Sequence, residues 1–167
     1  MNTKTKKLST VSMVLCGMFA ALVAIGAFIQ IPVPYMDYFT LQFFFVLLAG
    51  LILGADKGAI SVGCYVLLGL VGVPIFAAGG GIGYIFRPSF GYLVGFIVSA
   101  YVTGKVCEKL KASYKNYLLA CLAGFVVTYA IGIVYKFIIL NFYAHTPATL
   151  GVIFLSCFPL DMPGDFV

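Results

Sequence analysis

Long apolar runs, broken by short polar or glycine- and proline-containing connections, extend over most of the chain. Runs of this length predict membrane-spanning helices, since about 20 apolar residues cross a hydrocarbon core of roughly 30 Å. The stretch 31–34, Ile-Pro-Val-Pro, ends the first run, because proline lacks an amide hydrogen and restricts the residue before it. The pattern predicts five helices, at Leu8–Gln30, Tyr38–Ala55, Gly58–Val73, Pro88–Thr103 and Asn116–Leu140.

The third predicted helix and the C-terminal region depart from this regular pattern. Gly58–Val73 is shorter than a full span, which leaves room for the glycine-rich stretch after it to dip inward as a loop. After Asn141 the sequence predicts a turn at 145–147 and an apolar piece at 148–158 that is too short to span. We expect an interfacial segment there, with His145 as a loop residue rather than a ligand or general base.

Composition determines the class of protein. Hydrophobic residues make up 63% of the chain, charged residues make up 9%, and the mean hydropathy is +1.13. These values exclude a water-soluble globular domain and predict an integral membrane protein. We therefore expect an all-α, polytopic membrane helix bundle that forms a single transmembrane domain over residues 1–167. The five cysteines lie mostly in apolar runs without metal-ligand spacing, so we predict no metal site and no cofactor.

The positive charges fall on one side of the predicted membrane. If the N-terminus is cytoplasmic and the helices alternate in direction, only Arg87 and Lys136 lie outside. This distribution follows the positive-inside rule and explains the net charge of +5 without nucleic acid as a partner. The lysines on the inner side are Lys4, Lys6, Lys7, Lys57, Lys105, Lys109, Lys111 and Lys115.

A glycine-rich stretch beside the only arginine is the leading candidate for a small-ligand site. Four glycines lie between Gly79 and Gly83, and Arg87 follows closely. Gln42 would lie on the same outer side, where a buried amide needs a partner in the protein or the ligand. Asp37, Tyr84, Asp161 and Asp165 would lie there too, and ionisable groups at membrane level usually have a partner or a function.

The sequence motifs argue against an enzyme. Gly104-Lys105 is followed by valine and so fails the phosphate-binding loop pattern. The glycine run follows an apolar helix rather than a strand, so it is no dinucleotide fingerprint either. We find no nucleophile elbow and no other catalytic constellation, and we predict no catalytic residues.

Small residues on two predicted helices have the spacing that allows close helix contact. In the first helix, Ala20 and Ala24 form a small-xxx-small pair, which fits either packing inside the bundle or docking of a partner membrane protein. In the fourth, Gly91, Gly95 and Ser99 form a second close-packing stripe.

Several motifs together resemble the BioY family, the biotin-specific S components of energy-coupling factor (ECF) transporters. They begin with residues 20–27, the proline pair at 32–34 and Phe-Thr-Leu-Gln at 39–42. The match continues through 47–50, 69–76, the glycine run, 91–96 and the Pro-Gly-Asp at 163–165, so it covers essentially the whole chain.

The resemblance implies a bacterial plasma-membrane protein that binds biotin from outside with high affinity and docks onto a transmembrane T component with two ATPases. It implies that Ala20 and Ala24 contact the T component. Asp165 would accept hydrogen bonds from the ureido nitrogens of biotin, and Arg87 would pair with the carboxylate or donate to the ureido oxygen. Phe76, Tyr84 and Phe86 would either pack on the biotin rings or anchor the protein at the interface. The implied biotin contacts are Gln42, Gly79, Gly81, Tyr84, Arg87 and Asp165.

The chain departs from the family pattern at two places. Arg87-Pro88-Ser89-Phe90 stands where the family often has Gly-Pro-Thr-Gly. The family also has six helices and a lysine three residues after the aspartate of Pro-Gly-Asp, whereas this sequence stops at Val167. We therefore expect five complete spans and the start of a sixth, from truncation or natural variation. The alternatives are an S component for riboflavin or thiamine, or a small intramembrane enzyme.

Overall fold

A computed structural model of the chain describes residues 9–31, 39–143, 149, 151 and 153. The predictions for Asp37, His145, Asp161 and Asp165 lie outside these residues, as does most of the expected interfacial segment. The described part is helical, apart from a two-residue antiparallel pair in which Gln30 faces Thr40. In chain order the elements are α1 (Thr10–Phe28), β1 (Gln30–Ile31), β2 (Phe39–Thr40), α2 (Gln42–Leu53), α3 (Ala55–Val71), the 3₁₀ helix η1 (Ile82–Phe86), α4 (Phe90–Lys109), α5 (Tyr114–Ile138) and the π-helical turn η2 (Ile139–Tyr143).

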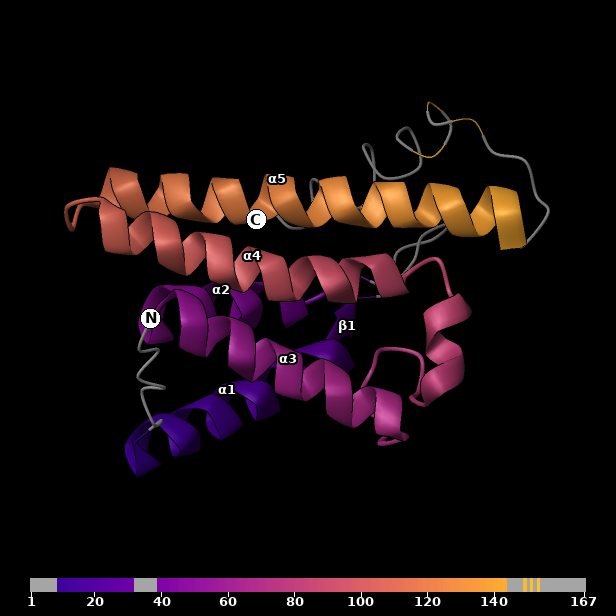
Figure 1. Ribbon diagram of the computed structural model, residues 1–167, viewed down its shortest axis with the longest axis horizontal. Helices are drawn as coiled ribbons and strands as arrows, with labels where there is room; N and C mark the ends of the chain where they lie inside the picture. The colour runs from indigo at the N-terminus through magenta and orange to yellow at the C-terminus, as the bar shows by residue number, and fades with distance from the viewer. Residues whose placement is uncertain (1–8, 32–38, 144–148, 150, 152, 154–167) are drawn as a thin grey trace, which may run out of the picture.

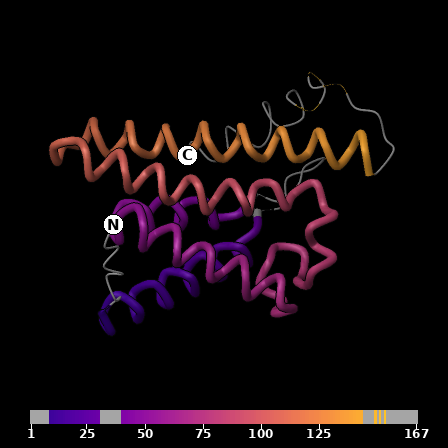
Figure 2. The backbone as a smooth tube through the Cα atoms, in the orientation of Figure 1, coloured from indigo at the N-terminus to yellow at the C-terminus, as the bar shows by residue number. Residues whose placement is uncertain are grey.

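The helices pack in layers, with α1 on one side of the bundle and α5 on the other (Figure 1). Between them, α2 and α3 contact both α1 and α4, and α4 runs antiparallel to α5 along its whole length. The backbone trace shows α2 turning directly into α3 at the end where α4 turns into α5 (Figure 2). Gly54 makes the first of these turns with φ 82°, a conformation that residues with a side chain seldom adopt. The opposite end holds η1 and the glycine-rich segment.

The small-residue stripe of α4 packs against α5, as predicted. A methyl group on Gly95 would lie 3.0 Å from the Thr128 carbonyl oxygen, and one on Gly91 would overlap Tyr135. Ser99 is fully buried one turn further along, where α5 presents Gly124. At Gly95 the two backbones approach closely, and at Gly91 the missing side chain makes room for Tyr135 of α5, so both crossings gain dispersion energy along the seam.

Three described helices are long and apolar enough to cross a membrane: α1, α4 and the continuous helix Tyr114–Tyr143. Large apolar side chains on their outer faces are exposed, as in Val14 of α1 and Val126 of α5, which suits contact with lipid. The other two α-helices are shorter, since α2 has 12 residues and α3 has 17. At about 1.5 Å per residue, α2 covers only about 18 Å. The expected count of five complete spans therefore stays a prediction.

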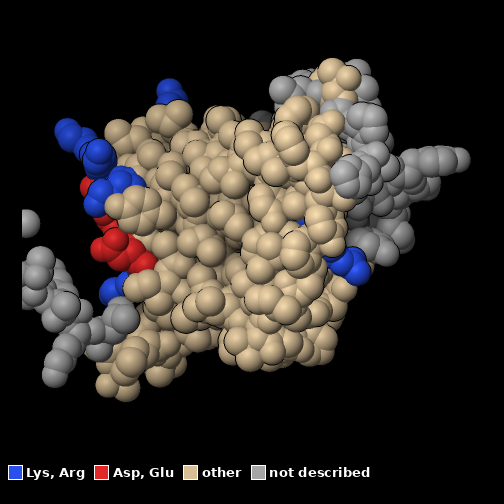
Figure 3. Space-filling view, turned by 45° about the vertical axis from the view of Figure 1, so that its right-hand side comes forward, with Lys and Arg blue, Asp and Glu red and all other residues tan. Residues whose placement is uncertain are grey.

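Charged side chains gather at one end of the described molecule, and a broad uncharged surface follows (Figure 3). This is the end where α2 meets α3 and α4 meets α5. Arg87 follows η1 and Lys136 lies in the last turn of α5, both at the opposite end. For the described residues, the predicted separation of positive charges therefore agrees with the structure, and Lys4, Lys6 and Lys7 lie outside them. The charged residues that belong to the first end are Asp56, Lys57, Lys105, Glu108, Lys109, Lys111 and Lys115.

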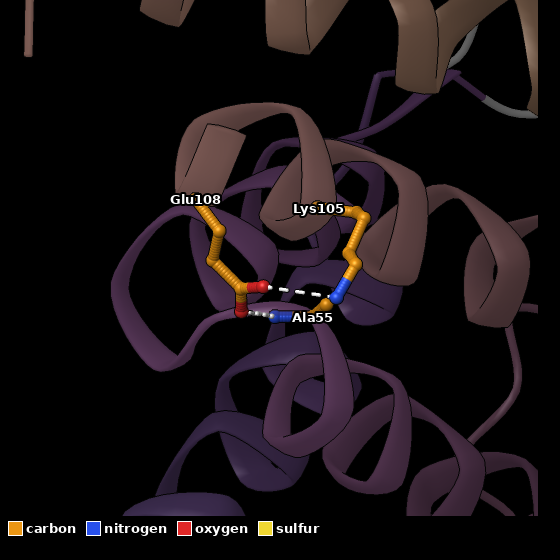
Figure 4. A network of polar contacts seen from close by, with 3 residues as sticks. All are labelled: Ala55, Lys105 and Glu108. Atoms are coloured by element: carbon orange, nitrogen blue, oxygen red, sulfur yellow. Dashed lines mark hydrogen bonds and ion pairs between the residues drawn. The ribbon is translucent and has the colours of Figure 1, made fainter. Parts of the chain in front are cut away.

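The prediction that the fourth helix ends at Thr103 is wrong, because α4 continues to Lys109. The Glu108 carboxylate accepts the Ala55 N–H at the start of α3 at 3.0 Å and pairs with Lys105 at 3.4 Å (Figure 4). Lys105 and Glu108 are three residues apart on one helix face, so their pairing favours helix. The α3 N–H also gains an acceptor that its own helix cannot supply. Residues 104–109, which were predicted to connect the fourth and fifth helices, therefore belong to α4.

Candidate ligand-binding site

The glycine-rich segment, residues 72–87, forms a compact structure at the end opposite the lysines. Phe76 and Gly79 exchange two backbone hydrogen bonds, of 2.9 and 3.1 Å, which close a tight turn. Gly79 and Gly81 have φ values of 110° and 103°, in the region that favours glycine. The chain then enters η1. At its start, the Tyr84 N–H donates to the Gly81 carbonyl at 3.0 Å. Both glycines predicted for the site therefore have a conformational role in shaping it.

Helix α3 holds this segment by two polar contacts and one steric fit. The Gly81 N–H donates to the Gly69 carbonyl at 2.7 Å, and the buried Tyr65 hydroxyl donates to the Ile75 carbonyl at 3.1 Å. The Phe76 ring packs directly on the backbone of Gly69, where any side chain would overlap it. Phe76 is only 1% exposed as a result.

Helix α1 and helix α5 each add a further hydrogen bond to a backbone carbonyl of the segment. Gln30 Nε2, just after α1, donates to the Ala77 carbonyl at 2.9 Å and to the Ala27 carbonyl at 3.1 Å. From α5, the Tyr135 hydroxyl donates to the Ile85 carbonyl at 2.5 Å. Three elements that are distant in sequence, β1, α3 and α5, therefore position residues 75–85.

Aromatic rings form a continuous row through the segment. Phe76 packs edge-on against Tyr65 with ring centroids 5.5 Å apart, and it meets the Tyr84 ring at a tilt with centroids 4.6 Å apart. The Arg87 guanidinium carbon lies 5.3 Å from the Tyr84 ring centroid, within range of a cation–π contact. Phe76 and Tyr84 are buried, whereas Arg87 is exposed. The row therefore leads from the core to a positive charge at the surface.

Gln42 supplies a buried polar group beside the inner end of this row. It is 3% exposed, and its side chain lies near the Tyr65 hydroxyl. Its Nε2 has no hydrogen-bond partner among the described residues. Leaving such a donor unpaired costs about 1–3 kcal/mol. A ligand with an acceptor oxygen would recover that free energy, so Gln42 is the clearest mark of a binding function at this end.

Five of the six predicted ligand residues are brought to this end by the fold. Gln42 and Tyr84 lie along the aromatic row, and Arg87 follows η1. Gly79 and Gly81 form the adjoining turn. The sixth predicted residue, Asp165, lies outside the described residues.

Phe86 differs from the two other aromatics predicted to pack on the ligand. Its side chain is 53% exposed and stacks on Tyr143 with ring centroids 4.9 Å apart. Phe86 thus lies at the surface, while Phe76 and Tyr84 belong to the core.

The two alanines predicted for partner docking are placed differently from each other. Ala20 is 8% exposed and belongs to the core, and Ala24 is half-buried and packs against the same core. The exposed small residues of α1 are Gly17 and Ala21, and no other group lies within 4 Å of the position that a Gly17 side chain would take.

Sequence reasoning missed Gln30, Tyr65 and Tyr135. Each is a polar side chain in or beside an apolar helix, which is a usable signal, because a buried hydroxyl or amide needs a partner. Their partners are backbone carbonyls, which leave no mark in the sequence. No group of three or more His, Cys, Asp or Glu side chains able to hold a metal occurs in the part of the chain that the structure describes.

Comparisons with known proteins identify the family. The BioY family matches residues 1–167. A probable biotin transporter BioY of Lysinibacillus sphaericus is 41% identical over 96% of this chain and 82% of its own length. The biotin transporter BioY of Thermotoga maritima is 45% identical over 77% of this chain and 73% of its own length.

A solved structure shares the fold of this chain. The crystal structure of the S component for biotin from an ECF-type ABC transporter superposes with a TM-score of 0.80, at 25% identity, over 99% of this chain and 86% of that one. The expectations of an all-α membrane bundle and of a transporter rather than an enzyme are confirmed by these matches. This chain is a multi-pass membrane protein that belongs to the BioY family, as the sequence resemblance predicted.

Proposed function

We propose that this chain is the biotin-binding S component of an ECF-type vitamin transporter. Two relatives are named as biotin transporters, and the solved structure that it resembles is an S component for biotin. In this role the protein captures biotin with high affinity from the outer side and passes it to an energising complex. It acts as a binding protein, with biotin as transported ligand rather than cofactor.

The observation that carries the proposal is the unpartnered Gln42 amide at the buried end of the aromatic row. Biotin combines a ureido group, which has two donors and one acceptor, with apolar rings, an apolar chain and a carboxylate. Gln42 Nε2 can donate to the ureido oxygen, Tyr84 can contact the apolar part, and Arg87 lies where a carboxylate would reach the surface. For this orientation the family resemblance suggests Asp165, which lies outside the described residues, as the acceptor for the ureido nitrogens.

The opposite orientation of biotin is the second arrangement that this site permits. Arg87 would then donate to the ureido oxygen, and Gln42 would donate to the carboxylate. A buried carboxylate prefers a cationic partner over an amide. The exposure of Arg87 and the burial of Gln42 therefore favour the first orientation.

The separation of charges supports an orientation with the N-terminus in the cytoplasm. Lysines are concentrated at the α2–α3 and α4–α5 connections, and the glycine-rich segment lies at the other end. By the positive-inside rule the lysine end is cytoplasmic. The ligand site then faces outward in the cell membrane, where an uptake protein must meet its ligand.

The proposal is tested by equilibrium binding to purified protein with biotin, riboflavin and thiamine. We expect nanomolar binding of biotin alone, and a loss of affinity in Arg87→Ala and in Asp165→Ala. Lys111→Ala, which removes an exposed cation at the opposite end of the molecule, is the control and should bind as the wild type does. Unchanged biotin affinity in both site variants would refute the site, and binding of riboflavin or thiamine instead would refute the substrate.

Docking of a transmembrane T component, with two ATPases, is the second part of the proposal. The family resemblance points to Ala20 and Ala24, and the exposed residues Gly17 and Ala21 extend the same stretch of α1 to the outer surface. A flat, small-residue face allows a partner helix to approach closely. The face available for docking is therefore Gly17, Ala21 and the exposed part of Ala24.

Tryptophan substitutions test this face. Ala21→Trp and Ala24→Trp should prevent co-purification with a T component while biotin binding persists, because the bulky ring blocks the approach of the partner. Ala20→Trp is a poor probe, since Ala20 is buried and the change would disturb the core itself. Ile60→Trp, on the exposed face of α3, is the control. Normal assembly with Ala21→Trp and Ala24→Trp would exclude this docking face.

A further inference from the structure

We propose that Gln30 is a positioning residue which holds the glycine-rich segment over the ligand site and thereby sets how long the ligand stays bound. Gln30 does so through the backbone of the segment, without contacting the ligand. The part of the proposal that concerns ligand lifetime rests on the proposed function. The part that concerns the segment itself does not.

The amide of Gln30 joins two regions that lie far apart in the sequence. Its Nε2 donates to the Ala27 carbonyl in the last turn of α1 and to the Ala77 carbonyl, 47 residues away. The carbonyls in the last turn of a helix lack partners within that helix, so the first bond caps α1. The second bond uses the remaining hydrogen of the same nitrogen to hold the segment.

The donor nitrogen is itself held in place by the chain around it. Gln30 pairs with Thr40 in the β1–β2 ladder, and the Ile29 carbonyl accepts the Leu41 N–H at 3.2 Å. One turn earlier, Gly26 packs against the backbone of Gln42 so closely that an added methyl group would lie 2.8 Å from its Cα. The end of α1 therefore positions both the Gln42 amide and, through Gln30, the segment that carries Phe76.

Ala77 directly follows Phe76, the central ring of the aromatic row. Without Gln30, the described contacts that hold this part of the segment come from α3: the Tyr65 hydroxyl on the Ile75 carbonyl and the Gly81 N–H on the Gly69 carbonyl. Both act from the same side. The bond from Gln30 ties the turn to the end of α1, so its loss leaves the turn held by α3 and lets it move away from the end of α1.

Glutamine is well suited to this position for a chemical reason. The two carbonyl oxygens each need an N–H donor, and both donors come from one nitrogen. A primary amide supplies two N–H groups on one nitrogen without adding a charge. Methionine has a similar length but no donor. Glutamate would present acceptor oxygens to two carbonyls, and asparagine is one methylene shorter and cannot make the same reach from the same backbone. Lysine carries three donors on a flexible stem and can replace both bonds.

The first test is hydrogen exchange of the ligand-free protein in detergent, because it needs no ligand. In Gln30→Met and Gln30→Asn, we expect the Gly79 and Gly81 amides to exchange roughly tenfold faster, as befits the loss of one or two hydrogen bonds. Gln30→Lys should exchange within about threefold of the wild type. Ile29→Ala, an exposed neighbour, is the control for general loosening of this end.

The second test is the dissociation rate of radiolabelled biotin from the same variants. We expect Gln30→Met and Gln30→Asn to release biotin roughly tenfold faster, with association changed by less than about threefold. Gln30→Lys should restore slow release. This rescue separates positioning by donors from a simple loss of packing.

The outcomes distinguish this inference from the proposed function. Wild-type exchange in both Gln30→Met and Gln30→Asn would overturn the inference, as would equally fast exchange in Ile29→Ala. Faster exchange of the segment with unchanged biotin release would overturn its role in ligand lifetime. If the wild type binds no biotin while the exchange pattern holds, the proposed function fails and the positioning of the segment by Gln30 stands.

Discussion

Glycine serves two different purposes at the α4–α5 seam and in the glycine-rich segment. Along the seam, Gly95 lets α4 meet the α5 backbone and Gly91 makes room for the Tyr135 side chain, so both contacts depend on shape. In the segment, Gly79 and Gly81 allow a tight turn, and side chains from β1, α3 and α5 hold the segment by donating to the carbonyls of Ala77, Ile75 and Ile85. Close packing of this kind makes the α4–α5 seam rigid. The glycine-rich segment is held by separate hydrogen bonds, which can break one at a time.

The two regions also differ in their unpaired polar groups. The seam buries Ser99, whose hydroxyl has no partner among the described residues, but it lies between two closely packed helices. At the glycine-rich end, the unpaired Gln42 amide lies beside a row of aromatic rings that leads to Arg87. A buried donor is therefore informative about binding only where the surrounding side chains also suit a ligand.

The largest effect is expected from a bulky side chain in the seam. Gly95→Leu would force the α4 and α5 backbones apart, because even the first carbon would meet the Thr128 backbone. We expect a loss of roughly 1–3 kcal/mol in the free energy of unfolding, measured by denaturant titration in micelles. Gly63→Leu on α3, where no other group lies within 4 Å, is the matched control. Equal stability of the two variants would contradict close packing at the seam.

A change at Gln42 should separate stability from ligand affinity. Gln42→Leu removes the unpaired donor while it keeps a side chain of similar size, so we expect stability to stay the same or rise by about 1 kcal/mol. Biotin affinity should fall roughly tenfold or more, because the donor to the ligand is lost. Denaturant titration and equilibrium binding measure the two quantities. A parallel fall in both would show that the amide supports the fold instead of the ligand.

The smallest effect is expected at the charged end. Glu108→Gln keeps an oxygen for the Ala55 N–H but removes the charge that pairs with Lys105. Both side chains are 47% exposed, so solvent screens the pair and we expect a loss of at most about 1 kcal/mol. The loss should shrink at high salt. Biotin affinity should not change, and a clear fall in affinity would mean that the two ends are coupled.

Much of the fold could be predicted from apolar runs and small-residue spacing, because both act locally along the chain. The stripe of α4 and the separation of lysines from Arg87 are direct results of such patterns. The end of α4 could not be predicted, because the polar turn up to Lys109 is helical through contacts of Glu108 with another helix. Spacing alone also could not decide which small residues of α1 face inward, and the structure places Ala20 in the core.

The candidate site could be predicted where it depends on unusual side chains and not where it depends on backbone acceptors. Gln42 and Arg87 were recognisable as polar residues in an apolar chain. Gln30 and Tyr65 act on the carbonyls of Ala77 and Ile75, and any residue provides such a carbonyl. Only the folded chain shows which carbonyl lies within reach.

Hydrogen exchange with and without saturating biotin tests most directly whether the glycine-rich end is the ligand site. We predict that biotin slows exchange at the backbone amides of residues 76–87 and near Gln42, and leaves the middle of α5 and the α2–α3 turn unchanged. Protection confined to the lysine end, or biotin binding without added protection of the glycine-rich segment, would contradict the account.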